Sequence, residues 1–193
     1  MNPEELLKYM ALLSKLKDTP RHCWSPEGRR ESVAEHCWRL AMMALLIKDK
    51  IQGIDTDRLI KICLVHDLGE AITGDIPTFE KTESDELTEQ KAIDKIFADM
   101  PKYIGDELKE LYYEYENQST TEGRLAKALD KCEALDQHNQ SDINTWLPFE
   151  YDLQMTYGTK ECEEFPYMKE LRDMLRNVSK TKIEEEEKAK DKQ

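Results

Sequence analysis

Apolar residues recur along this chain mostly at intervals of three and four positions, the spacing of one face of an α-helix. Leu6, Met10 and Leu13 form the first such stripe and predict a helix over about residues 3–17. Strict alternation, which is typical of a half-buried strand, is rare. Seven glycines and seven prolines in 193 residues leave room for long helices. The pattern predicts an all-α protein.

Two local signatures predict where helices begin. Ser32 precedes Glu35 by three positions, the spacing of a capping box, and predicts the start of a second helix that carries His36 inward. Ser119 and Glu122 predict another capping box. The helix that this box opens is expected over about residues 120–140. The remaining periodic segments predict helices over about 56–67, 84–99, 103–116 and 161–178.

The length of the chain suits one domain with a substantial core, which we expect over residues 1–180. Residues 181–193 are mostly charged and predict a solvated, disordered tail. The sequence lacks an apolar run long enough to span a bilayer, and its N-terminus lacks the layout of a secretory signal. We therefore expect no membrane span and a cytoplasmic location.

Net charge restricts the partners. The 41 acidic residues exceed the 28 basic ones and give a net charge of −13. Nucleic-acid polymers are bound through clustered Lys and Arg, so this balance argues against them as partners. A small phosphorylated substrate remains compatible with it, because one cation and one or two arginines suffice to hold a phosphate.

The five cysteines are scattered, and none forms a C-x-x-C pair, which argues against a structural zinc motif. Buried free thiols in a reducing compartment are the interpretation that this pattern favours. The residues are Cys23, Cys37, Cys63, Cys132 and Cys162.

His66 and Asp67 are adjacent at the point where an apolar helical run turns polar, and they offer an imidazole nitrogen and a carboxylate oxygen to one divalent cation. His36 upstream and Asp130 downstream supply two further ligands of the same kinds. Four protein ligands on an octahedral ion leave positions for water and substrate, and the bound water has a lowered pKa. This order of residues predicts the metal site of a hydrolase.

Plainer interpretations exist beside this one. A His–Asp pair is common by chance, and His36 has the alternative of an ordinary helix histidine. Asp130 follows an apolar stripe, where an unpaired buried carboxylate is costly, and Lys131 or an arginine would balance it as a metal would. We interpret His22 and His138 as non-ligands, one in a loop and one on the surface.

Two acidic residues follow the dipeptide. Glu70 lies three positions after Asp67, so a continuing helix would place it near the ligand face, and it is our first candidate for proton transfer. Asp75, in the loop beyond, is the second. Arg21 lies in a short loop ahead of the helix of His36, where it suits a phosphate clamp; a plain surface arginine is the alternative.

Several motifs resemble those of a known family. They are Glu31–His36 (ESVAEH), His66–Ala71 (HDLGEA), Gly74–Pro77 (GDIP), Tyr115–Ser119 (YENQS) and Ala128–Glu133 (ALDKCE). Over about residues 5–175 the chain resembles the HD-domain metal-dependent phosphohydrolases, and within them the branch of 5′-deoxynucleotidases. The resemblance implies a single helical HD-domain bundle with the metal site between its central helices.

The resemblance also implies a metal and its ligands. One divalent cation, which is Co, Mn, Mg, Zn, Fe or Ni, would be bound by His36, His66, Asp67 and Asp130. Glu70 would assist the attacking water. The branch commonly pairs its subunits, so a homodimer is implied as well.

Three further residues resemble the family's substrate-binding groups. Arg21 would meet the phosphate, Trp24 would pack on the sugar, and Asp75 would lie beside the sugar and act as a second catalytic acid. Some bacterial members have the Arg and Trp adjacent, whereas two residues separate them here. Arg29 and Arg30 therefore stay open as alternatives for the phosphate.

Three functional hypotheses follow. The leading one is a metal-dependent phosphomonoesterase that hydrolyses deoxyribonucleoside 5′-monophosphates to deoxynucleoside and phosphate. The second keeps the site but changes the substrate to a phosphodiester, a nucleoside triphosphate or an alarmone, although superfamily members with the cyclic-nucleotide and alarmone activities are usually longer. The third is a non-catalytic helical metal-binding module, against which the full ligand set and Glu70 argue.

Overall fold

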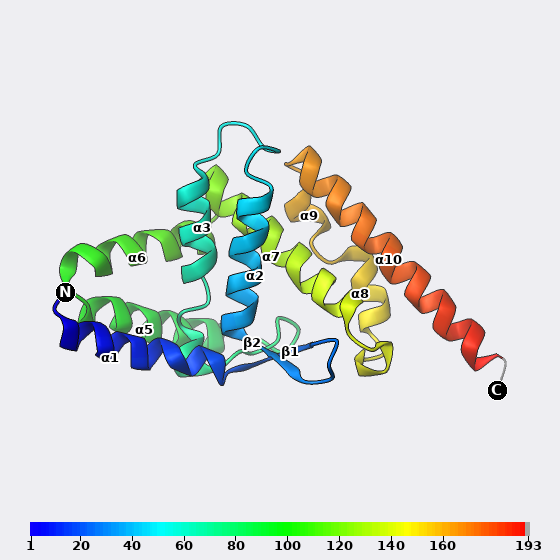
Figure 1. Ribbon diagram of the computed structural model, residues 1–193, viewed down its shortest axis with the longest axis horizontal. Helices are drawn as coiled ribbons and strands as arrows, with labels where there is room; N and C mark the ends of the chain where they lie inside the picture. The colour runs from blue at the N-terminus through cyan, green and yellow to red at the C-terminus, as the bar shows by residue number, and fades with distance from the viewer. Residues whose placement is uncertain (192–193) are drawn as a thin grey trace.

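The computed structural model describes residues 1–191 as a bundle of helices with one short two-stranded sheet (Figure 1). Its elements, with 3₁₀ helices marked η, are α1 (Pro3–Leu13), η1 (Ser14–Lys17), β1 (Pro20–Trp24), β2 (Arg30–Ser32), α2 (Val33–Leu46), α3 (Thr56–Val65), α4 (Glu70–Thr73), α5 (Glu83–Asp99), α6 (Lys102–Glu116), α7 (Thr121–Gln140), η2 (Ile143–Thr145), α8 (Glu150–Thr156), α9 (Thr159–Cys162) and α10 (Pro166–Lys190). The helices predicted over 56–67, 84–99 and 103–116 are found as α3, α5 and α6, each within two residues of its expected ends.

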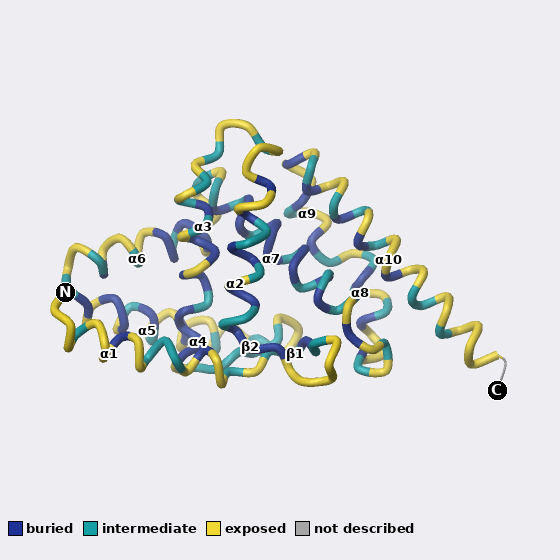
Figure 2. Tube along the Cα trace, in the orientation of Figure 1, coloured by how far each residue is buried: buried dark blue, intermediate teal, exposed yellow. Residues whose placement is uncertain are grey.

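Helix α7 lies at the centre of the bundle. It packs against α2, α3 and α6, and also against α9, α10 and strand β1. Leu125, Leu129 and Asp130 of this helix are all buried. The interior of the bundle, where α2, α3 and α7 meet, is lined by buried positions from each of these helices (Figure 2). Polar residues on the facing sides of these helices are therefore withdrawn from solvent.

The capping box predicted for α2 is confirmed. The Ser32 hydroxyl accepts a hydrogen bond from the Glu35 backbone N–H at 3.3 Å, and the Glu35 carboxylate accepts one from the Ser32 N–H at 2.9 Å. The second predicted capping box is wrong, because Glu122 accepts instead from the Asp55 N–H at 2.9 Å. Thr120, not Ser119, caps α7, because Thr120 has the extended backbone that an N-cap requires and accepts from the Gly123 N–H at 3.0 Å.

The segment predicted as a loop between the first two helices contains the antiparallel pair β1 and β2. Pro20 pairs with Ser32 and Trp24 with Arg30, with an irregularity in the register between them. Strands this short carry too little alternation to be predicted from the sequence. The hairpin leads directly into α2, so it places the side chains of β1 beside the interior ends of α2 and α7.

Both ends of the chain differ from the prediction. Helix α1 ends at Leu13, and the last residues of the predicted first helix form η1. Helix α10 begins at Pro166, later than expected, and continues to Lys190 through most of the segment predicted to be disordered (Figure 1). Ion pairs one turn apart, such as Lys190 with Glu186 at 2.7 Å, accompany this extension. Residues 192–193 of that segment lie outside the described residues.

A close crossing of α6 and α7 depends on Gly123. A Cβ atom at this position would lie 2.3 Å from the Glu114 carbonyl oxygen, so a larger residue would push the two helices apart. The crossing brings Tyr115 of α6 against Asp130 of α7, where their side chains form a hydrogen bond. This backbone contact therefore helps to position a predicted metal ligand.

The predicted buried thiols are confirmed, since all five cysteines are buried and free. Cys132 of α7 and Cys162 of α9 lie closest together, with their Sγ atoms 3.5 Å apart. Within residues 1–191, none of the helices combines the length and the apolar character that crossing a membrane requires.

The α2 cap predicts a pH-dependent stability. Hydrogen bonds from Arg29 and Ser32 outweigh the opposing effect of burial and lower the pKa of Glu35 to about 2. Because this pKa lies below the ordinary value of 4.5, the stabilisation is present above pH 4.5 and lost as the pH falls toward 2. Glu35→Gln should cost on the order of 0.5 kcal/mol of unfolding free energy at pH 7, since the pair is largely exposed. Urea unfolding of wild type and Glu35→Gln at pH 7 and pH 3 measures this difference in unfolding free energy.

The control is Glu27→Gln, which removes an exposed carboxylate from the turn between β1 and β2. A deficit of the Glu35→Gln protein that is as large at pH 3 as at pH 7 would contradict the assignment, because over this range the Glu35 carboxylate of the unfolded chain takes up a proton while that of the folded protein stays ionised.

Candidate metal centre and adjoining cavity

The His66 imidazole is oriented by the end of α3. His66 follows the last residue of the helix, and its ring is buried. Its Nδ1 lies 3.0 Å from the Cys63 carbonyl oxygen, which can only accept, so Nδ1 carries the hydrogen. The lone pair of the neutral ring is then on Nε2, the atom that faces the site. This tautomer is the one that a metal ligand needs.

The His36 imidazole is oriented in the same way by a carboxylate. Its Nδ1 lies 2.5 Å from Glu133 Oε2 of α7, and the ring is fully buried on α2. Glu133 is held ionised, because His36, Arg21 and Arg39 outweigh the effect of burial and lower its pKa. Nδ1 therefore donates, and Nε2 again faces the site. Among residues 1–191, neither His36 Nε2 nor His66 Nε2 has a hydrogen-bond partner.

Two carboxylates meet these nitrogens. Asp67 Oδ2 lies 3.1 Å from His66 Nε2 and 3.7 Å from His36 Nε2. Asp130 Oδ1 lies 3.3 Å from His36 Nε2, while its Oδ2 accepts from the Tyr115 hydroxyl at 2.8 Å. Donor atoms of His36, His66 and Asp67 all lie within 4.8 Å of one another. The structure thus brings the four residues of the predicted ligand set together from α2, α7 and the end of α3.

This donor set fits a divalent cation. Two buried imidazole nitrogens without partners, facing two carboxylate oxygens, are what a site of mixed nitrogen and oxygen ligands requires. Burial and Arg21 oppose protonation of His36, but Glu133 and Asp130 outweigh them and raise its pKa to about 10. A cation bound through His36 Nε2 must displace that proton, so metal binding should strengthen as the pH rises.

Glu70 and Asp75, the predicted acids, lie close to these ligands. Glu70 is the first residue of α4 and is buried, and its Oε2 has no hydrogen-bond partner within residues 1–191. Burial, together with the charges of Asp67 and Asp75, raises its pKa to about 11. Burial also raises the pKa of Asp75, and the Arg21 charge opposes that rise. The cluster is rich in carboxylates and gains electrostatically from a cation.

A cavity of about 310 Å³ adjoins the cluster. Arg21 and Asp75 lie on its wall, and Arg21 also contacts Glu133, the partner of His36. The rest of the wall includes both polar and apolar side chains, among them His22, Phe79, Leu135, His138, Glu150, Leu153 and Tyr157. The volume is within the range of small-molecule sites, roughly 300–1,000 Å³.

The three candidate arginines lie in different surroundings. Arg21 is mostly buried and pairs with Glu31 at 2.9 Å and Glu133 at 3.4 Å. Arg29 is exposed and pairs with Glu35, and the exposed Arg30 lies over the Trp24 ring at 4.2 Å. Arg21 is the one of the three that lines the cavity.

The structure does not bring Trp24 to the cavity wall. Its ring is instead covered by the Arg30 guanidinium, in a cation–π contact. The resemblance implied that Trp24 packs on the substrate sugar beside Arg21. The contacts of Trp24 in the structure do not reproduce that arrangement.

The comparison with known proteins agrees with this geometry. Residues 13–172 match the HD-domain family. The chain belongs to the HD-domain family. Its members include metal-dependent phosphohydrolases.

Several relatives of this chain are named 5′-deoxynucleotidases, among them a human and a fission-yeast protein. The human protein named 5′-deoxynucleotidase HDDC2 is 38% identical over 134 residues, which are 67% of this chain and 65% of that protein. The protein named 5′-deoxynucleotidase hdd1 of Schizosaccharomyces pombe is 32% identical over 170 residues, covering 84% of this chain and 79% of its own. The match thus spans about 65% of the length of the human relative.

Solved HD-domain structures share the fold. A predicted metal-dependent phosphohydrolase from Magnetospirillum magnetotacticum superposes with a TM-score of 0.76 at 24% identity, covering 94% of this chain and 95% of that one. A conserved hypothetical protein from Pyrococcus furiosus gives a TM-score of 0.65 at 29% identity, with coverage of 90% and 99%.

Sequence reasoning missed the residues that orient the ligands. Glu133 and Tyr115 lie within the quoted motifs but received no role. Asp130 and Glu133 are three positions apart, so the two carboxylates share a helix face, and that spacing was an available signal. The placement of His22 and His138 was wrong as well: both are largely buried, His22 in β1 and His138 in α7, because they pack toward Glu150.

The Glu133 contact predicts an effect on metal affinity without loss of a ligand. Glu133→Gln removes the charge that orients and polarises His36, and should weaken Co²⁺ binding by about 10- to 100-fold. Titration of the metal-stripped protein with Co²⁺, followed by absorbance, measures this change.

Asp136→Asn is the matched control. Asp136 lies on α7, as Glu133 does, and both carboxylates contact Arg39 of α2, Asp136 at 2.7 Å and Glu133 at 3.3 Å. Asp136 does not contact His36. Equal Co²⁺ affinities for the two variants would mean that Glu133 has no role at the centre.

Proposed function

We propose that this HD-domain protein is a metal-dependent phosphomonoesterase that hydrolyses deoxyribonucleoside 5′-monophosphates to deoxynucleoside and phosphate. One observation carries the proposal: the unpartnered nitrogens of His36 and His66, within the described chain, converge with Asp67 and Asp130 beside a cavity whose wall includes Arg21. The names of the human and fission-yeast relatives support the substrate class.

A divalent cation held by these ligands would supply Lewis-acid activation of water and would neutralise charge on the phosphate. Glu70 is three residues from Asp67 and buried, and its Oε2 has no competing partner among residues 1–191. It is therefore suited to carry a proton between the attacking water and the leaving oxygen. Asp75, on the cavity wall, is the second acid available for that transfer.

Arg21 is suited to the phosphate. Its ion pairs with Glu31 and Glu133 fix the guanidinium on the cavity wall, so little side-chain entropy is lost when it binds an anion. The guanidinium has five N–H donors, and those not used by the glutamates remain for phosphate oxygens. Beyond it, the apolar part of the wall suits the sugar and base of a nucleotide.

The substrate is tested with a panel of deoxy- and ribonucleoside 5′-monophosphates and metal-stripped protein reloaded with Co²⁺, Mn²⁺, Mg²⁺ or Zn²⁺. We expect phosphate release from the deoxy series, and its loss in Asp67→Ala together with the bound metal. The control Asp57→Ala removes an exposed carboxylate from α3, the helix that leads to the centre, and should keep full activity.

No phosphate from any monophosphate, in protein that still binds metal, would reject the phosphomonoesterase. Release of pyrophosphate or of a linear nucleotide from other substrates would then indicate the triphosphate, alarmone or phosphodiester alternative. Inactivity on every substrate would indicate the non-catalytic module.

Glu70→Gln separates proton transfer from metal binding. The substitution keeps the size of the side chain but removes its ability to carry a proton, and should lower kcat by about 10²- to 10⁴-fold while the metal content stays unchanged. Steady-state kinetics and metal analysis of the same samples check both parts. Glu80→Gln, at an exposed position further along the same segment, is the control. An unchanged kcat would remove Glu70 from the reaction.

A further inference from the structure

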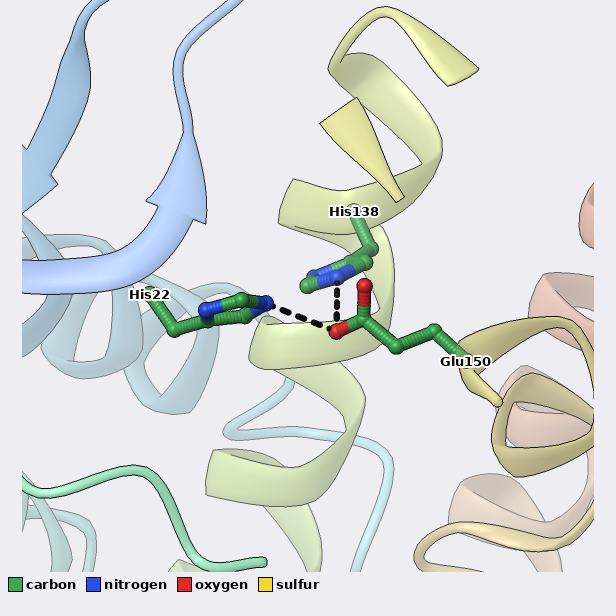
Figure 3. Close-up of side chains that lie close together, drawn as sticks. All are labelled: His22, His138 and Glu150. Atoms are coloured by element: carbon green, nitrogen blue, oxygen red, sulfur yellow. Dashed lines mark hydrogen bonds and ion pairs between the residues drawn. The ribbon is translucent and has the colours of Figure 1, made fainter. Parts of the chain in front are cut away.

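A second group of metal-ligating side chains lies on the cavity wall, apart from the four residues of the metal centre. His22 comes from β1, His138 from the last turns of α7, and Glu150 from the first position of α8 (Figure 3). Both imidazole Nε2 atoms lie 2.9 Å from the same carboxylate oxygen, Glu150 Oε1. Donor atoms of the three residues all lie within 4.8 Å of one another.

The carboxylate is fixed by its other oxygen. Glu150 is 2% exposed, and its Oε2 accepts a hydrogen bond from the Leu147 N–H at 2.6 Å. This contact at the start of α8 leaves Oε1 facing the two imidazoles, as Figure 3 shows. Glu150 thus presents one carboxylate oxygen, Oε1, to both imidazoles.

The two rings are also held from behind. His138 Nδ1 lies 3.2 Å from Cys23 Sγ, and the His138 ring packs on Trp146 with centroids 5.7 Å apart. The His22 ring packs edge-on against Phe79 at 5.3 Å and nearly parallel to His138 at 5.8 Å. These contacts restrict the rotation of both rings, so the directions of the two Nε2 atoms are fixed.

The donor set and its dimensions suit a transition metal. Two imidazoles and one carboxylate are the protein ligands of many zinc sites that keep a fourth position open. Bonds of about 2.0–2.2 Å in a tetrahedral site separate the ligand atoms by roughly 3.3 Å. The observed nitrogen-to-oxygen distances of 2.9 Å are close to this value, so small side-chain shifts would admit an ion.

We propose that His22 Nε2, His138 Nε2 and Glu150 Oε1 bind a divalent transition-metal ion of the Zn²⁺, Co²⁺ or Ni²⁺ type. The site shares no ligand with the centre formed by His36 and His66. Its three residues line the cavity, so the remaining coordination position faces the space in which a substrate would bind. An ion there would also tie the hairpin, α7 and α8 together.

A network of hydrogen bonds without metal is the competing description. Glu150 Oε1 can accept from two imidazole N–H groups at the observed distances, which would satisfy all three side chains. The two descriptions differ in how many ions the protein binds and in which substitution removes one.

The test counts metal ions in the full chain. Metal-stripped wild type, Glu150→Gln, Asp67→Ala and the double variant are titrated with Co²⁺ and with Zn²⁺, and bound metal is measured by equilibrium dialysis and elemental analysis. We expect Glu150→Gln to bind one ion per chain fewer than wild type and to lose part of the visible Co²⁺ absorption. The double variant should lose the ions of both single variants.

A Glu150→Gln protein that binds as many ions as wild type, with the same Co²⁺ spectrum, would overturn the proposal in favour of the hydrogen-bond network. Glu164→Gln is the matched control, an exposed glutamate that pairs with Arg124, and should match wild type. Circular dichroism and thermal melting of the stripped proteins establish folding, and His22→Gln, in the hairpin, repeats the test where Glu150→Gln does not fold.

The metal count of Glu150→Gln can be interpreted even if the proposed function is wrong. An Asp67→Ala protein with unchanged metal content, or an enzyme inactive on all nucleotides, concerns the first centre only. The number of ions lost in Glu150→Gln depends on the second.

Discussion

The buried carboxylate of Glu133 is the constraint on which the site depends. An ionised group with no exposure to water is costly unless every oxygen is compensated, and here His36, Arg21 and Arg39 approach it at 2.5, 3.4 and 3.3 Å. These partners come from α2 and β1, whereas Glu133 belongs to α7. The contacts that compensate the Glu133 carboxylate therefore hold the hairpin, α2 and α7 together. The contact with His36 also orients its Nε2 toward the other ligands.

The carboxylates around the metal centre explain why a bound cation would stabilise it. Asp67, Glu70, Asp75 and Asp130 crowd into one region of a chain whose net charge is already −13. Burial and the like charges of neighbouring carboxylates both disfavour the ionised forms of Glu70 and Asp75 and raise their pKa values. An anionic phosphate would meet this repulsion unless a bound cation and the Arg21 guanidinium reverse the local field.

The sequence predicted most of the helices, because a helix depends on local spacing, and its motifs indicated the four candidate ligands that the structure brings together. The capping box of Ser32 and Glu35 and the stripe before His66 need only neighbours along the chain. The α7 cap was misplaced by one residue because Ser119 and Thr120 offer the same hydroxyl, and only the backbone distinguishes them. Continuation of α10 past residue 180 was missed because its exposed face resembles a disordered charge run.

Contacts between distant segments could not be predicted in this way. His22, His138 and Glu150 are separated by 116 and 12 positions, and nothing in their neighbourhoods indicates that they meet. Their meeting depends on β1, an element too short to leave a periodic signal.

Strand β1 explains how two clusters share one cavity. In a regular strand, alternate side chains point to opposite faces, which would send Arg21 and His22 apart. The pairing of β1 with β2 is irregular between Pro20 and Trp24, and Arg21, His22 and Cys23 all line the cavity. Arg21 then reaches Glu133 beside the metal centre, while His22 reaches Glu150. A shift of the hairpin would therefore disturb both clusters together, so their geometry is coupled through three consecutive residues.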